Sequence, residues 1–318
     1  MFKILLADVL DSDSEQRLNA GAQVIRPPAG DEATLCEHIG DCDALVARTH
    51  TPVTRAVLAA GQRLRVVGVA GVGVDRVDTA AAAELGITVL NTPDASSDAV
   101  AEFAVSLMLQ LLRPTARLAA GYKQGIFKEA RKSAHGRELR ELTVGIVGMG
   151  RIGSRVGRIC SAGCGARVLY NDIVEVGPFA YPATPADKET IWSTADIITL
   201  HVPLTDLTRK LVEGEVLARL RPEAYLINTA RGAVVDNAAL AKALQKNALA
   251  GAALDVTDPE PLPVGHPLFD CNNCIITPHI AARTFGGLHR MYAVVDDVLD
   301  HLRTGPPNRP PGDAMQKK

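Results

Sequence analysis

Three polar residues in the second half of the chain each follow closely on an apolar run, and together they could carry out acid–base chemistry. They are Arg231, Glu260 and His279. An arginine binds a carboxylate through two parallel hydrogen bonds. A histidine gives or takes a proton near neutral pH, and a glutamate beside it favours the charged form. Taken alone, an Arg or a Glu in such a place is more often a surface charge.

A second group of residues has the spacing of a nucleotide-binding loop. Gly148, Gly150 and Gly153 form the pattern G-x-G-x-x-G after an apolar run, and a helix-like segment follows. The glycines allow a tight turn, a close approach of backbone to pyrophosphate, and close packing of helix on strand. Asp172 ends the next apolar run, where a carboxylate binds the adenosine ribose and repels a 2′-phosphate. The pattern favours NAD over NADP, and the alternative is a glycine-rich turn without a ligand.

Short apolar runs alternate with helix-like segments along most of the chain, which predicts βαβ units and parallel sheets. Ligands of open parallel sheets bind outside the carboxyl ends of the strands, so Arg231, Glu260 and His279 are expected to converge there. The predicted strands are 3–7, 23–26, 44–48, 65–70, 87–90, 143–148, 167–170, 196–201, 224–229, 250–256 and 274–277. The predicted helices are 31–39, 54–60, 98–118 with an interruption near Pro114, 152–162, 214–219, 236–246 and 284–303. Residues 121–140 are predicted to form a loop, and the Pro-rich residues 306–318 a mobile tail.

Composition excludes several classes of protein. A length of 318 residues favours two domains, and 47% hydrophobic with 22% charged residues is typical of a globular protein. The net charge of −2 leaves no basic surplus for nucleic acid, and no apolar run is long enough to span a membrane. Six cysteines do not indicate a disulfide scaffold, and the lone Cys271-x-x-Cys274 does not predict a metal site. A cytoplasmic location is expected.

Several motifs, in this order, resemble the D-isomer-specific 2-hydroxyacid dehydrogenase family. The resemblance runs from Ala44 to about His301 and rests on residues 69–75, 91–93, 99–102, 148–153, 201–205 and the segments around Arg231, Glu260 and His279. The separations of 29 residues from Arg231 to Glu260 and 19 from Glu260 to His279 fit the family's Arg–Glu–His set. The resemblance implies that Arg231 binds and polarises the substrate, that His279 is the acid and base, and that Glu260 is its partner.

The resemblance also implies further binding residues. Asp255 is expected to face the carboxamide of the cofactor, and backbone N–H groups around residues 70–73 to hold the substrate carboxylate. The expected cofactor-binding residues are Gly148, Gly150, Arg151, Ile152, Gly153, Asp172, His201, Val202, Pro203, Thr208, Thr229, Ala230 and Asp255. The expected substrate-binding residues are Ala70, Gly71, Val72, Gly73 and Arg231.

The fold that the resemblance implies is α/β, with two doubly wound parallel-sheet domains. Residues 1–98 and 283–305 are expected to form a smaller, flavodoxin-like substrate domain, and residues 99–282 a Rossmann domain that binds NAD. The long helix near Asp98–Leu112 is expected to pair with its twin in a homodimer.

The implied activity is hydride transfer between NAD(H) and a small 2-oxo or 2-hydroxy acid of the D series. Glyoxylate or hydroxypyruvate is the first expectation and 3-phosphoglycerate the second, because Val69 stands where phosphoglycerate dehydrogenases often have Arg. Arg76 replaces a usual Asn, and Arg48 could reach an acidic substrate or be a surface charge. Glu260 argues against formate dehydrogenases, which carry Gln there. The alternative is an NAD-sensing binding protein resembling the corepressors of this fold.

Overall fold

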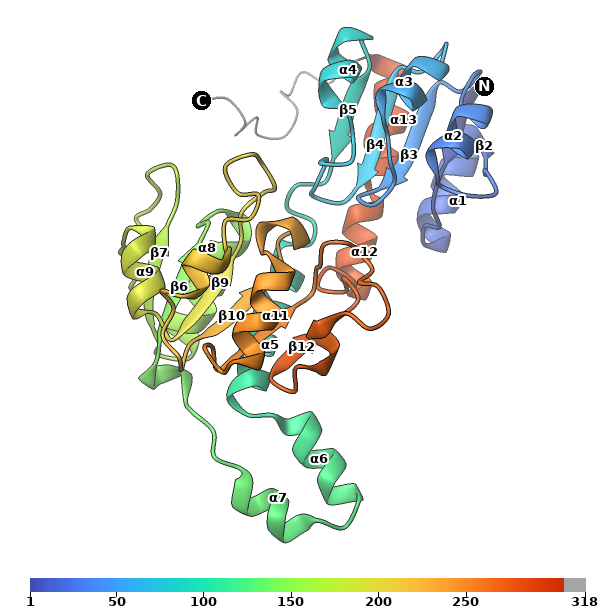
Figure 1. The fold of residues 1–318 in the computed structure, drawn as a ribbon. Coiled ribbons are helices and arrows are strands. Elements are labelled where there is room, and N and C mark those ends of the chain that lie inside the picture. The colour runs from blue at the N-terminus through green and yellow to red at the C-terminus, as the bar shows by residue number, and fades with distance from the viewer. Residues whose placement is uncertain (306–318) are drawn as a thin grey trace. The chain divides into compact units, whose positions relative to one another are not determined.

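The computed structural model describes residues 1–305, the side chain of Ser133 apart, and the predicted tail of residues 306–318 lies outside them. The chain forms two compact units (Figure 1). Among the described residues, one unit consists of Met1–Ser96 and residues 283–305, and the other of Ser97–Ala282. In the described part of the chain, no helix combines the length and the apolar character needed to cross a membrane.

The first unit contains a five-stranded parallel sheet in the order β2-β1-β3-β4-β5, which is the flavodoxin-like order. Its strands are β1 (Phe2–Leu6), β2 (Ala22–Ile25), β3 (Ala44–Arg48), β4 (Val66–Ala70) and β5 (Thr88–Asn91). Its helices are α1 (Ser12–Gly21), α2 (Glu32–His38), α3 (Arg55–Ala60), α4 (Thr79–Glu84), α12 (Phe285–Tyr292) and α13 (Val294–Thr304). Two separate apolar clusters lie on the two faces of this sheet.

The helix α13 packs directly on this sheet although it comes from the far end of the described chain. At Gly68 of β4, a Cβ atom would lie 2.4 Å from the Cγ2 atom of Val298, so the strand must carry glycine where the helix crosses it. The single helix predicted over 284–303 is two helices, because the chain breaks at Ala293 between α12 and α13. The prediction of one continuous helix was therefore wrong.

The second unit contains a seven-stranded parallel sheet in the order β12-β11-β10-β9-β6-β7-β8. Its strands are β6 (Thr143–Val147), β7 (Arg167–Asn171), β8 (Thr184–Pro185), β9 (Ile197–Leu200), β10 (Tyr225–Asn228), β11 (Gly251–Leu254) and β12 (Cys274–Ile276). The chain moves outward from β6 to β8 on one side and then returns to β9 on the other. This reversal between β6 and β9 is the switch point at which nucleotides bind in Rossmann folds. The expected α/β class with two doubly wound parallel sheets is confirmed.

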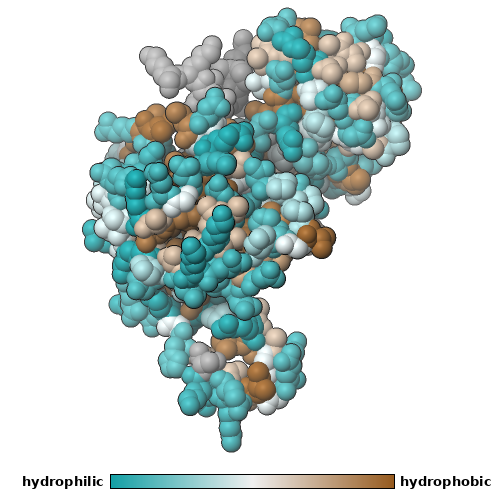
Figure 2. All heavy atoms as spheres, in the orientation of Figure 1, coloured by the Kyte–Doolittle hydropathy of each residue, from teal (hydrophilic) through white to brown (hydrophobic). Residues whose placement is uncertain are grey.

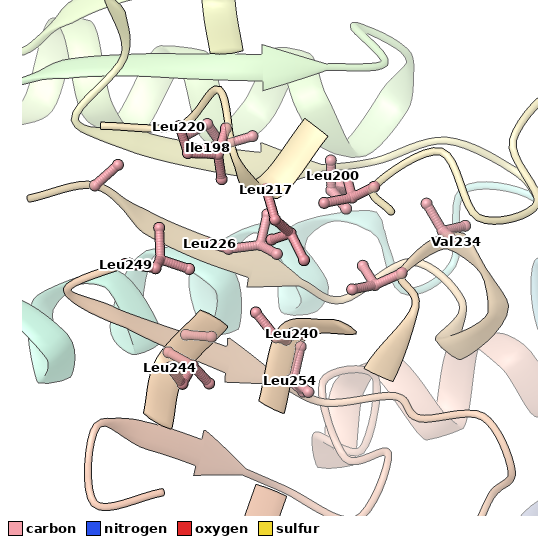
Figure 3. Close-up of a cluster of buried hydrophobic side chains, with 14 of the residues drawn as sticks. Ile198, Leu200, Leu217, Leu220, Leu226, Val234, Leu240, Leu244, Leu249 and Leu254 are labelled. Atoms are coloured by element: carbon pink, nitrogen blue, oxygen red, sulfur yellow. The ribbon is translucent and has the colours of Figure 1, made fainter. Parts of the chain in front are cut away.

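The second unit contains helices that cover both faces of its sheet and two that project away from it (Figure 1). They are α5 (Ser97–Leu112), α6 (Thr115–Lys123), α7 (Phe127–Ser133), α8 (Arg151–Arg158), α9 (Lys188–Thr194), α10 (Gly214–Leu217) and α11 (Asn237–Gln245), with 3₁₀ turns at Leu139–Glu141, Gly232–Val234 and Pro267–Asp270. A π-helical turn, Ile159–Gly163, continues α8. One apolar cluster joins α10 and α11 to β9, β10 and β11 through leucines such as Leu217, Leu226, Leu240 and Leu254 (Figure 3). A second cluster joins α5 and α8 to the opposite face.

The predicted loop over residues 121–140 was wrong, because most of it is helical. The helices α6 and α7 form an arm that projects from the second unit (Figure 1). Tyr122 and Phe127 meet edge to face with ring centroids 5.5 Å apart, and Ile126 packs over Gly121. The arm has almost no buried face, so hydrophobic periodicity could not reveal it. Its Ala, Glu, Lys and Arg residues are nevertheless good helix formers.

Candidate active site

The loop that carries the three glycines follows β6 and leads into α8. Gly148 has a φ of +91°, and a Cβ atom there would lie 2.5 Å from the carbonyl oxygen of His201. A Cβ atom at Gly153 would lie 2.0 Å from the carbonyl oxygen of Gly148, whereas at Gly150 it would meet nothing within 4 Å. Backbone atoms therefore crowd the loop at Gly148 and Gly153, whereas there is open space beside Gly150.

The end of α8 that meets this loop is suited to bind an anion. Gly150 is the N-cap residue and, having no side chain, makes no side-chain cap hydrogen bond to the first turn of the helix. Asp172, at the end of β7, accepts hydrogen bonds from the backbone N–H groups of Met149 (2.7 Å) and Val174 (3.3 Å). This carboxylate is thereby fixed beside the glycine loop.

Two polar atoms near the ends of β9 and β10 are buried and have no hydrogen-bond partner in residues 1–305. They are Nδ1 of His201 and Oγ1 of Thr229. The other ring nitrogen of His201 lies 2.9 Å from Oγ1 of Thr199, and burial lowers the pKa of His201 to about 3. The imidazole is thus neutral at physiological pH and unsuited to be the general acid. Orphaned buried polar groups are rare in folded proteins, so these two atoms fit a polar ligand at this edge.

The turn after β9 holds the remaining predicted cofactor residues of that strand. Thr208 donates from its hydroxyl to the carbonyl oxygen of Pro203 at 2.6 Å and accepts from the N–H group of Thr205 at 2.8 Å. The side chain of Val202 would come within 2.9 Å of a Cβ atom at Gly148. The turn and the glycine loop therefore lie against one another. The glycine cradle, the uncapped helix and the orphaned atoms together fit a dinucleotide.

His279 and Glu260 form a pair in the second unit. Nδ1 of His279 lies 2.7 Å from Oε1 of Glu260, and both side chains are partly exposed. Burial raises the pKa of Glu260, but the hydrogen bond and the charge of His279, with the charge of Arg231, outweigh it and hold this pKa below its usual value. The carboxylate is therefore ionised when it meets the imidazole.

Arg231 lies three residues beyond Asn228, the last residue of β10, and close enough to Glu260 for its positive charge to help lower the pKa of Glu260. Its Nη1 donates to the carbonyl oxygen of Ala230 at 2.8 Å, and Asn228 donates to the carbonyl oxygen of Arg231 at 2.9 Å. Asn228 also accepts from the N–H group of Ala230 at 3.0 Å. These bonds fix the backbone from which the guanidinium extends, so Arg231, Glu260 and His279 are brought together as the parallel strands predict.

Asp255 has a structural role that the sequence did not reveal. It is 1% exposed, and its carboxylate accepts from the N–H groups of Ile280 (2.9 Å) and Ala281 (2.8 Å) and from the Thr277 hydroxyl (2.7 Å). Its carbonyl oxygen accepts from the N–H group of His279 at 2.9 Å. His279 itself has a φ of +52°, a left-handed conformation that is costly for a residue with a Cβ atom. Asp255 holds the backbone on both sides of this residue, and its expected contact with a carboxamide remains a prediction.

The predicted substrate loop, residues 70–73, belongs to the first unit. Gly71 has a φ of +154°, and a Cβ atom there would lie 2.4 Å from Cγ2 of Thr49. Asn91 donates to the carbonyl oxygen of Val72 at 2.7 Å, which secures the loop just after β4. Its role toward a substrate remains a prediction.

Arg48, at the end of β3, donates to the Tyr292 hydroxyl at 3.1 Å and lies over that ring at 5.6 Å. Arg48 therefore packs against Tyr292 within the first unit.

Comparison with known proteins identifies the family of this chain. The sequence model of the D-isomer specific 2-hydroxyacid dehydrogenase NAD binding domain matches residues 105–281. The chain belongs to this family. It is 36% identical over 303 residues to glyoxylate reductase of Korarchaeum cryptofilum, with 90% of each chain covered. It is 40% identical over 287 residues to D-3-phosphoglycerate dehydrogenase of Methanocaldococcus jannaschii, covering 89% of this chain and 54% of that one.

A solved structure of the family is similar over almost the whole chain. D-lactate dehydrogenase of Aquifex aeolicus, solved with NAD and lactic acid, has a TM-score of 0.87 and 26% identity and covers 95% of this chain and 96% of that one. The present chain spans only about half the length of the phosphoglycerate dehydrogenases that it matches. The family member described here therefore shares its NAD-binding domain with enzymes that act on different 2-hydroxy acids.

Proposed function

We propose that this family member transfers a hydride between NAD(H) and a small 2-oxo or 2-hydroxy acid. The observation that carries the proposal is the 2.7 Å contact between His279 and Glu260 beside Arg231. A neutral carbonyl needs a proton as it is reduced, and a carboxylate-braced imidazole is a suitable donor. An NAD-sensing binding protein of this fold could keep the same three residues, but no observation favours that alternative.

Each residue of the site has a distinct part in the proposed reaction. NAD(H), when bound, supplies or accepts the hydride. Arg231 binds the substrate carboxylate and polarises the carbonyl. His279 uses Nε2 for the proton, because Nδ1 is engaged by Glu260. In reduction the protonated imidazole gives its proton to the carbonyl oxygen, and in oxidation the neutral imidazole takes it from the hydroxyl.

The substrate is proposed to be glyoxylate or hydroxypyruvate, with 3-phosphoglycerate as the second candidate. The residues around Gly71 are proposed to hold its carboxylate through their N–H groups. The test is the loss of NADH absorbance with a panel of 2-oxo acids, measured for the wild type and Arg231→Lys. Arg231→Lys keeps the charge but loses the planar fork, so kcat/KM should fall by about 10²-fold or more while the NADH Kd stays nearly constant. Wild-type activity in this variant would contradict the assignment of Arg231.

Asp172 is proposed to select NAD over NADP. Its carboxylate is held beside the glycine loop by Met149, where a 2′-phosphate would meet a negative charge. The same panel run with NADPH should give a much lower kcat/KM than with NADH. An equal kcat/KM with the two cofactors would contradict this assignment of Asp172.

The protein is proposed to be a cytoplasmic homodimer that pairs through α5. Leu109 of α5 is 45% exposed, and the arm adds exposed Tyr122, Ile126 and Phe127. Figure 2 shows brown apolar spheres among teal polar ones on the arm that projects from the second unit. All six cysteines are free thiols, as a reducing compartment requires. Sedimentation should give about twice the chain mass of 33.7 kDa. A monomer at micromolar concentration would contradict the dimer.

A further inference from the structure

Glu260 lies on a segment that has neither helix nor strand. Residues 257–260 follow β11, and the Glu260 side chain is partly exposed. Its position relative to His279 therefore depends on what holds this segment. The backbone N–H group of Thr257 reaches Oε2 of Glu260 only at 3.4 Å, and the Thr257 hydroxyl donates to the carbonyl oxygen of Pro259 at 3.0 Å. These contacts shape the segment internally but do not attach it to the rest of the unit.

Attachment comes from the turn that follows Arg231. A Cβ atom at Gly232 would lie 1.9 Å from the carbonyl oxygen of Thr257 and 2.7 Å from the backbone nitrogen of Asp258. The peptide between Thr257 and Asp258 therefore rests directly on Gly232. This close approach sets the distance between the two backbones but not the direction in which the segment continues toward Glu260.

Asn237, the first residue of α11, provides the directional contact. Its side chain is 5% exposed, and Nδ2 donates to the carbonyl oxygen of Asp258 at 3.0 Å. Its Oδ1 atom is buried and has no hydrogen-bond partner among the described residues. A buried amide oxygen without a partner is unfavourable. The donor half of the amide is therefore what the structure uses at this position.

We propose that Asn237 is a positioning residue that holds residues 257–260 where Glu260 meets His279. The inference rests on the proposed function, because it assigns Asn237 an effect on proton transfer through Glu260. The charged groups that face Glu260 are His279 and Arg231. Asn237 is neutral and bonds to the backbone two residues before Glu260, so it acts on the placement of the carboxylate.

The test is a double-mutant cycle with Asn237→Ala and Glu260→Gln, read as kcat/KM for reduction across pH. Asn237→Ala should lower kcat/KM by about 10-fold to 100-fold, the usual cost of a small misplacement in a site. It should also move the alkaline limb of the profile to lower pH, in the same direction as Glu260→Gln. In the Glu260→Gln background the same change should add almost nothing, because the group that it positions is already gone. The NADH Kd of Asn237→Ala should match that of the wild type. The control Asn272→Ala, which changes an exposed asparagine, should keep wild-type activity.

Asn237→Ser keeps a short donor and should restore part of the lost activity and of the pH profile. It also serves if Asn237→Ala fails to fold, in which case Asn237→Ser against Glu260→Gln completes the cycle. An equal loss in both backgrounds, or an unshifted pH profile, would show a merely structural asparagine and overturn the positioning role alone. If Glu260→Gln itself leaves activity and profile unchanged, the proposed proton pair fails, and the inference fails with it.

Discussion

The glycine loop after β6 is built from backbone, whereas the acid–base site after β10, β11 and β12 is built from side chains. In the loop, Gly148 and Gly153 lie where any Cβ atom would strike a carbonyl oxygen. In the acid–base site, Arg231, Glu260 and His279 come from three strand ends and are aligned by buried polar partners, Asp255 among them. The first kind of site fails when an atom is added, and the second when a donor or acceptor is removed.

The largest expected effect is on the rate when the acid–base site loses its imidazole. His279→Ala should lower the rate of reduction by about 10²–10⁴-fold, the usual contribution of a positioned acid or base. The Kd for NADH, measured by fluorescence, should change little because the glycine loop is untouched. His135→Ala, which removes an exposed histidine near the arm, is the matched control. A large loss of NADH binding in His279→Ala would mean that the two sites are not separable in this way.

Adding one methyl group to the glycine loop should give opposite results at two positions. Gly153→Ala forces a Cβ atom against the carbonyl oxygen of Gly148, so the free energy of unfolding should fall by about 3 kcal/mol or more. Gly150→Ala meets no protein atom and should leave stability almost unchanged, but it should raise the NADH Kd about tenfold or more, because the methyl group fills the open side of the loop. Chemical denaturation and NADH titration measure the two effects. Similar stability for both variants would refute the packing argument.

A smaller change should follow when the proton pair is altered without removing the imidazole. Glu260 is ionised because its pKa lies below the usual value, so it stabilises a positive charge on its partner. Glu260→Gln removes that charge, and the alkaline limb of the reduction profile should move to lower pH. Oxidation should extend to lower pH, since it needs the neutral imidazole. Glu223→Gln, at an exposed position, is the control. Unmoved limbs in both directions, with chemistry limiting the rate, would exclude the pair.

The smallest expected effect is on the pH dependence of the free energy of unfolding, through His201 near the proposed cofactor site. The folded pKa of His201 is about 3 against an ordinary value of 6.5. Below about pH 6.5 the unfolded chain binds a proton that the folded chain does not, so stability falls as the pH falls toward 3. This single group contributes a slope of at most about 1.4 kcal/mol per pH unit. His201→Asn should flatten the dependence between pH 7 and 5 in denaturation experiments. An identical slope would mean that His201 becomes charged in the folded protein.

Sequence reasoning predicted the fold class and which polar residues would lie together, but it missed several of the contacts that hold them. The glycine spacing is contiguous, and the carboxyl ends of parallel strands meet at one edge, so the order of strands and polar residues along the chain was enough to group Arg231, Glu260 and His279. Asn237 and the structural role of Asp255 were missed, because each acts on the backbone of a distant segment. The helical arm was missed because its helices bury little.

The hydrogen bonds of Asp255 to the chain around His279 should make the amides there exchange at a different rate from those of residues 257–260. The N–H groups of Ile280 and Ala281 end on a buried carboxylate, so they should exchange with deuterium as slowly as amides of the neighbouring strands. Residues 257–260 are mostly exposed and their Thr257 amide has only a 3.4 Å contact, so that segment should exchange faster. We therefore expect the proposed proton donor to belong to the slowly opening core of its unit, and its carboxylate partner to lie on a segment that opens more readily.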